Sequence, residues 1–181
     1  QKAEFLEILN RIDFEKVKDH PNILIAARFW DDARYEAAKT FYRFMRAIDD
    51  LIDNHKTSHL GFSEDEKEKF AGDVRQWLEV IRDSNGESSL YSDLTETINR
   101  FRIPLWPLEA FAKSMVYDIH HDGFSTIPKF LDYAGGASVA PASIFVHLCG
   151  LREEEDRYLP PLFDVREAAI PCAVFSYLVH I

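Results

Sequence analysis

The feature that most constrains the fold is an uninterrupted segment at residues 41–55, FYRFMRAIDDLIDNH. It has no glycine or proline and few β-branched residues, which is typical of an α-helix. At about 100° per residue, a stripe spanning roughly 60° of this helix carries only polar side chains, while apolar residues cover the opposite side. The members of this polar stripe are Tyr42, Arg46, Asp49 and Asp53.

Asp49 and Asp53 are one helical turn apart, so their charges repel by a few tenths of a kcal/mol. A hard divalent cation would remove that repulsion, and Mg²⁺ takes one or two protein carboxylates together with waters and substrate phosphates. Arg46, one turn earlier, has the geometry to grip a phosphate directly. Spacing alone leaves two readings open, a phosphate-binding site and a solvated face of an amphipathic helix.

Helical periodicity recurs along the chain, and no segment alternates as a strand does. The pattern predicts an all-α bundle in a single domain, residues 1–181. Ser63 with Glu66 is a capping-box signal. Two glycines and Pro141 interrupt the sixth helix. This pattern fits a broken helix whose small residues let a long apolar substrate lie against the backbone, and it slightly favours a helix–loop–helix junction without a ligand. The seven predicted helices span residues 3–19, 34–54, 63–83, 90–101, 108–122, 129–149 and 165–181, and residues 150–164 are predicted to be a loop.

Composition excludes some classes of function. The net charge of −10 and the pI of about 5.1 argue against nonspecific binding to nucleic acid and against an electrostatic anchor on anionic lipid. The sequence has no run of about 18 apolar residues and no signal-peptide pattern. Cys149 and Cys172 lie in apolar contexts, so we expect reduced cysteines in the core. These features predict a cytoplasmic protein.

The segment YRFMRAIDDLID resembles the first aspartate-rich motif of the squalene/phytoene synthase family. The resemblance implies a helical bundle of the isoprenoid synthase type around a central cavity. It implies Mg²⁺ ligands at Asp49 and Asp53, with Asp50 as the neighbouring aspartate that contacts substrate. It also implies that Arg46 binds diphosphate and that Tyr42 borders the cavity.

Three other places extend the resemblance. His20 matches a substrate-binding histidine, although the serines that usually follow are here Pro21, Asn22 and Ile23. Asp118, in MVYD, resembles the aspartate of an M-x-x-D segment, and a substrate-binding role is implied for it. Tyr133 follows at the family's spacing and is implied to lie in the cavity near the reacting cation.

The predicted last helix resembles the run that precedes the family's second aspartate-rich motif. Tyr177 and His180 stand where the family often has glutamine and asparagine, so the resemblance implies that they contact substrate. The sequence ends at Ile181, about where that motif should begin. We therefore expect a bundle incomplete at the C-terminus, in a chain that does not turn over substrate alone.

The activity that the resemblance implies is head-to-head condensation of two prenyl diphosphates through a cyclopropyl diphosphate intermediate. It favours farnesyl over geranylgeranyl diphosphate, with NADPH required only for a squalene product. Peripheral membrane contact for product release is compatible with it, and the oligomeric state stays open. The alternatives are a non-catalytic assembly factor or lipid-binding protein of the same fold, or another terpenoid synthase with a DDxxD motif.

Overall fold

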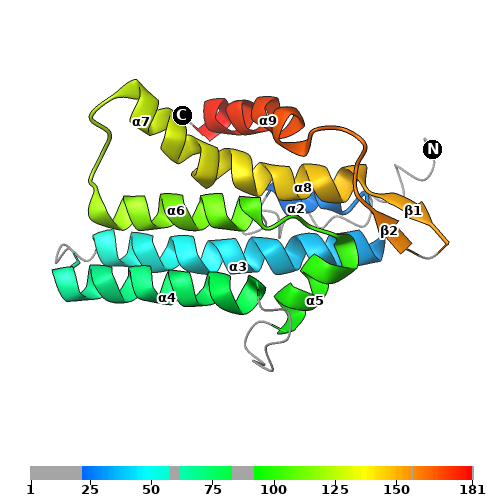
Figure 1. Cartoon of the computed structure of the whole chain (residues 1–181). Helices are drawn as coiled ribbons and strands as arrows, with labels where there is room; N and C mark the ends of the chain where they lie inside the picture. Colours follow the sequence, from blue (N-terminus) through cyan, green and yellow to red (C-terminus); the bar gives the residue numbers. More distant parts are fainter. Residues whose placement is uncertain (1–21, 58–61, 83–91, 156, 181) are drawn as a thin grey trace, which may run out of the picture.

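The all-α fold is confirmed in the computed structural model, which describes residues 22–57, 62–82, 92–155 and 157–180. The predicted helix at residues 3–19 lies outside the described residues, and so does His20. Figure 1 shows long helices stacked roughly alongside one another. The helices are α2 (Asn22–Ala27), α3 (Asp32–Thr57), α4 (Glu64–Arg82), α5 (Ser92–Phe101), α6 (Trp106–His120), α7 (Ile127–Ala134), α8 (Ala140–Gly150) and α9 (Val165–His180).

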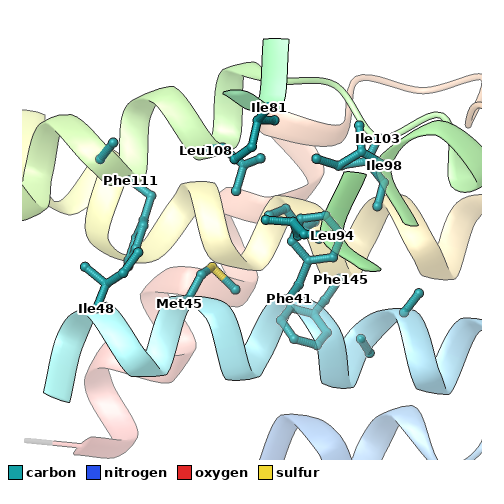
Figure 2. Close-up of a cluster of buried hydrophobic side chains, with 14 of the residues drawn as sticks. Phe41, Met45, Ile48, Ile81, Leu94, Ile98, Ile103, Leu108, Phe111 and Phe145 are labelled. Atoms are coloured by element: carbon teal, nitrogen blue, oxygen red, sulfur yellow. The ribbon is translucent and has the colours of Figure 1, made fainter. Parts of the chain in front are cut away.

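Helix α3 lies at the centre of the packing, because it contacts α2, α5, α6 and α8. Phe41, Met45 and Ile48 on its apolar side are buried and meet side chains from α6 and α8, among them Phe111 and Phe145 (Figure 2). This burial confirms the apolar back predicted for residues 41–55. It also fixes the rotation of α3, which places the polar stripe along the edge of this cluster.

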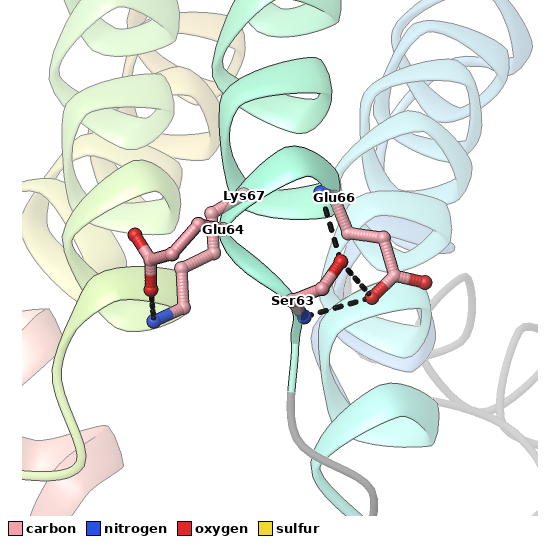
Figure 3. Close-up of polar contacts among 4 residues, drawn as sticks. All are labelled: Ser63, Glu64, Glu66 and Lys67. Atoms are coloured by element: carbon pink, nitrogen blue, oxygen red, sulfur yellow. Dashed lines mark hydrogen bonds and ion pairs between the residues drawn. The ribbon is translucent and has the colours of Figure 1, made fainter.

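The start of α4 confirms the predicted capping box (Figure 3). The backbone N–H of Ser63 donates to the Glu66 carboxylate at 2.8 Å, and the backbone N–H of Glu66 donates to the Ser63 hydroxyl at 3.3 Å. Two N–H groups that the helix leaves without partners are thereby satisfied. The helix consequently begins at Glu64, next to the predicted start.

The interruption at residues 135–141 is a π-helical turn, η3 (Gly135–Val139), so the predicted helix–loop–helix junction is wrong. The backbone N–H of Ala140 donates to the carbonyl of Gly135, five residues back. This wider turn accommodates Pro141, which has no N–H to donate, without breaking the helix. Chain direction is therefore continuous from α7 through η3 into α8.

One of the two glycines in this turn has a packing role. A Cβ atom on Gly136 would overlap the backbone carbonyl of Ala110 and the hydroxyl of Ser114, both on α6. Only a glycine permits such close contact between the two helices. A Cβ on Gly135 would meet nothing within 4 Å, so that position is not constrained in the same way.

Part of the predicted loop at residues 150–164 is a small antiparallel hairpin, which corrects the expectation of no strands. Strand β1 (Arg152–Glu154) pairs with β2 (Arg157–Leu159). Strands of three residues are too short to show a readable alternation. Asp164 then starts α9, since its carboxylate accepts the N–H groups of Arg166 and Glu167 at 2.8 and 3.1 Å. Among the described residues, no helix combines the length and apolar character needed to cross a membrane.

Candidate functional site

A groove of about 600 Å³ runs along α3 and the continuous helix α7–η3–α8, with further walls from α2, α6 and α9. Its lining includes the polar side chains Tyr42, Arg46, Asp49 and Tyr133, which together are called the polar end below. The remaining wall is largely apolar, and its members include Trp30, Met45, Phe111, Met115, Ala137, Pro141, Phe145 and Val146. A cavity of this size with a few polar groups at one end is typical of a small-molecule site.

Arg46 is the central charge of the polar end. Its guanidinium donates to Asp49 at 3.0 Å and pairs with Asp50 at 2.7 Å. All three side chains are about half exposed, and such pairs contribute little to stability. These groups are therefore free to exchange partners with an incoming anion at small cost. Asp53, one turn beyond Asp49, is exposed next to the groove.

Carboxylates from two helices gather around Asp49. Partial burial raises the pKa of Asp49 above its ordinary value, and the neighbouring negative charge of Asp53 raises it further. Arg46 opposes this effect, while Asp50 and Asp118 add to it. Asp118 comes from α6, so the structure places this predicted site residue beside the aspartates of α3. The crowding means that positive charge would be bound favourably here.

The donor set fits one kind of metal site. No three His, Cys, Asp or Glu side chains in the described parts of the chain come together as a metal-binding group. Mg²⁺, however, needs only one or two carboxylates when phosphates and waters complete its shell. The repulsion among Asp49, Asp53 and Asp118 is the feature that favours a cation. These residues fit Mg²⁺ that arrives with a diphosphate, and not a metal held by the protein alone.

Tyr133 is brought to the same groove from the last turn of α7. Its backbone carbonyl accepts a hydrogen bond from the Ser114 hydroxyl of α6 at 2.9 Å. Its ring centre lies 4.9 Å from that of Phe124 and 5.9 Å from that of Tyr117. Thus Tyr42, Arg46, Asp49 and Tyr133, predicted from separate motifs, border one groove.

The cysteines correct an expectation. Cys149 and Cys172 are exposed free thiols that line the groove, and they are not core residues. Their apolar sequence context reflects the apolar groove wall, which looks like a core in sequence. The same ambiguity hides other members of the wall, such as Phe111 and Phe145. An apolar residue gives the same sequence pattern whether it lies in a groove wall or in the core.

Two further predicted residues lie on α9. The backbone of Tyr177 and His180 is helical, as predicted, but their side chains lie outside the described part of the chain. Asp122, four residues after Asp118, is exposed in the connection between α6 and α7. Neither the groove lining nor the charges around Asp49 include it.

Comparison with known proteins agrees with this geometry. A family model described as squalene/phytoene synthase matches residues 18–169, which include α3, the whole of α7–η3–α8 and all of the groove lining except Cys172 and Ala173. Neither a search of curated proteins nor one of solved structures gave a match. The match covers most of the 181 residues. The chain belongs to the squalene/phytoene synthase family.

Proposed function

We propose that the protein is a prenyltransferase that condenses two prenyl diphosphates head to head through a cyclopropyl diphosphate intermediate. One observation carries the proposal. The Arg46–Asp49 end and the long apolar wall belong to the same groove. A prenyl diphosphate has the matching division, with a charged head and an apolar chain. The preference for farnesyl over geranylgeranyl diphosphate comes from the family resemblance.

Each end of the groove has a task in this chemistry. Arg46 would donate to diphosphate oxygens, in place of one of its aspartate partners. Asp49 and Asp53 would hold Mg²⁺, which supplies charge neutralisation for a departing diphosphate. The apolar wall would exclude water from the allylic cation left behind. Tyr42 and Tyr133 border the groove at the polar end, where that cation would form.

Reduction of the product is a separate question. A squalene product would require NADPH as hydride donor, whereas phytoene would not. The sequence has no glycine-rich nucleotide motif that assigns this step. An assay of the protein with labelled farnesyl or geranylgeranyl diphosphate, Mg²⁺, and NADPH present or omitted separates the products by carbon number and saturation. The proposal expects a 30-carbon head-to-head product in preference to a 40-carbon one.

Calorimetry tests the proposed binding mode without turnover. Mg²⁺ is titrated into the protein alone and into the protein saturated with farnesyl thiolodiphosphate, an analogue that does not ionise readily. We expect measurable Mg²⁺ binding only with the analogue, because two carboxylates are too few to hold the ion. An Asp49→Asn/Asp53→Asn double variant is the control and should lose the response. Equal Mg²⁺ affinity in both titrations would count against the proposal.

A second function is a lipid-binding protein of the same fold without catalysis. The observation that favours it is that Pro21, Asn22 and Ile23 stand where the family usually has the serines that contact diphosphate. Such a protein would bind farnesol about as tightly as farnesyl thiolodiphosphate, and Mg²⁺ would make no difference. The same calorimeter experiment with farnesol distinguishes the two functions.

A further inference from the structure

The connection between α6 and α7 carries a cluster of aromatic rings beside the groove. The Tyr117 ring stacks on the rings of His121 and Phe124. Its centre lies 4.0 Å from that of His121, with 6° between the ring planes, and 5.6 Å from that of Phe124, with 2° between the planes. Phe130 meets the edge of Phe124 at 5.3 Å. Tyr133, the groove tyrosine, packs against this stack through Phe124 and Tyr117. The rings therefore form one unit that ends in the groove.

Hydrogen bonds fix this connection to α6. The Tyr117 hydroxyl donates to the backbone carbonyl of Gly123 at 3.1 Å, next to Phe124. His121 Nδ1 lies 2.9 Å from the carbonyl of Tyr117, and Thr126 caps the start of α7 by accepting from the N–H of Lys129. In Figure 1 the connection lies at the end of the bundle that holds the C-terminal half of α3. The loop is thus held at this end of the bundle.

Phe124 is placed where a phenyl ring is costly. Phe124 lies on the segment that connects α6 and α7, and it is 41% exposed. Its ring nevertheless contacts the rings of Tyr133 and Tyr117. Exposed apolar area weakens folding, whereas aromatic pairs at these separations favour a defined ring orientation. The contacts of Phe124 thus limit how the Tyr133 ring can turn. The Ser114 hydrogen bond fixes the backbone of Tyr133 but leaves its side-chain torsions free.

We propose that Phe124 is a positioning residue, supported by Tyr117, that holds the Tyr133 ring at the polar end of the groove. The proposal rests on the proposed function, because the position of Tyr133 matters only if a prenyl diphosphate binds there. Tyr117 also precedes Asp118, which adds its charge to the environment of Asp49. Tyr117 of the aromatic unit and Asp118 of the carboxylate group are therefore consecutive residues of α6. Phe124 itself does not line the groove, so it acts through Tyr133.

The test is a double-mutant cycle on the affinity of the full chain for farnesyl thiolodiphosphate with Mg²⁺. Phe124→Leu keeps apolar volume but removes the flat ring, and we expect affinity to fall about three- to tenfold. In a Tyr133→Leu background the same change should have no further effect. Phe124→Tyr, which keeps the ring, should restore wild-type affinity. Phe163→Leu changes a 48% exposed aromatic in another loop and should leave affinity unchanged.

A second measurement needs no ligand. The ring protons of Tyr133 should shift in the NMR spectrum of Phe124→Leu but not of Phe163→Leu, because Phe124 lies 4.9 Å from Tyr133. An equal loss of affinity in both Tyr133 backgrounds, or no loss in either, would overturn the inference while leaving the proposed function intact. Failure of the wild-type protein to bind the analogue would overturn the proposed function, and the inference with it.

Discussion

Single residues at the polar end of the groove carry opposing electrostatic effects. Asp49 has a raised pKa because burial and nearby carboxylates outweigh the attraction of Arg46. Arg46 in turn pairs with two aspartates instead of one. Because carboxylates crowd around Asp49, the empty site is less stable than the same site with a cation that neutralises them. This is a common property of binding sites. Two predictions follow from this balance.

The first concerns Asp49→Asn. Between its ordinary pKa of 3.8 and the raised value of the folded state, the folded protein binds more protons than the unfolded chain, so stability falls as pH rises. At neutral pH the variant should be more stable than wild type by less than about 1 kcal/mol, since solvent screens a half-exposed group. This difference in the free energy of unfolding should vanish below about pH 3.8, the ordinary pKa of the carboxyl group. Urea unfolding at a series of pH values measures it.

The control for that series is Asp73→Asn, which changes an exposed aspartate on α4. It should leave the pH dependence of the unfolding free energy as in wild type. A loss of stability at neutral pH in Asp49→Asn would mean that the Arg46 ion pair dominates. The crowding of carboxylates would then be too weak to favour a cation.

The second prediction concerns Arg46→Lys. A lysine keeps the charge but cannot offer the paired donors of a guanidinium to a diphosphate. We expect the affinity for farnesyl thiolodiphosphate to fall about tenfold, with the unfolding free energy unchanged within about 0.5 kcal/mol. Arg43→Lys changes an exposed arginine on the same helix and is the control. Unfolding of Arg46→Lys without a specific binding defect would make Arg46 a structural residue only.

Sequence reasoning identified these residues because they repeat at helical spacing. Tyr42, Arg46 and Asp49 share one side of α3 at that spacing, and the groove lies there. Tyr133 was joined to them through the family resemblance, since nothing local links position 133 to α3. The apolar wall could not be assigned in this way. Phe111 and Phe145 are buried, and only tertiary packing shows which of their sides meets the groove.

Among the elements, the continuous helix from α7 through α8 is one that sequence patterns misjudged, and the short helix α2 and the hairpin are others that they missed. Glycine and proline predict a break, but a π-helical turn satisfies the backbone around them and keeps the helix continuous. Local propensity is overridden here by the packing of Gly136 against Ala110 on α6. The π-turn residues Ala137 and Ser138 also line the groove. The helix thus supplies both the close packing and part of the groove wall.

A matched pair of glycine substitutions tests this account. Gly136→Ala should destabilise the fold by about 2 kcal/mol or more, because its methyl group overlaps a backbone carbonyl that cannot easily move. Gly135→Ala, one residue away with open space around it, should be neutral or stabilising by up to about 1 kcal/mol. Thermal unfolding of both variants measures the difference. Equal effects would show that α6 and η3 do not pack as closely as described.

For the whole molecule, the sequence predicts the all-α class and the capping box of α4. It also predicts the boundaries of α4, α5 and α6 to within a few residues. Long amphipathic segments and helix caps are local signals, so they are readable without tertiary structure. The hairpin and the groove depend on contacts between distant segments. The two cysteines show the difference most clearly, because their apolar context belongs to the wall of the groove and not to the core.

The central claim is that one groove binds the diphosphate head at Asp49 and the prenyl chain along the wall that includes the cysteines. Cys149 and Cys172 are the two cysteines of the chain, and both are exposed in that wall. The most direct measurement is the rate of their alkylation by N-ethylmaleimide, followed for each cysteine by mass spectrometry. The rates are compared without ligand, with Mg²⁺ and farnesyl thiolodiphosphate, and with Mg²⁺ and inorganic diphosphate.

The account predicts that farnesyl thiolodiphosphate with Mg²⁺ slows alkylation of both cysteines at least about tenfold. Inorganic diphosphate, which lacks the chain, should not protect them. Asp49→Asn/Asp53→Asn should abolish protection by the farnesyl analogue at the same concentration, because its head is no longer held. Unchanged alkylation of Cys149 and Cys172 in the presence of an analogue that calorimetry shows to be bound would contradict the account, since the prenyl chain would then lie elsewhere.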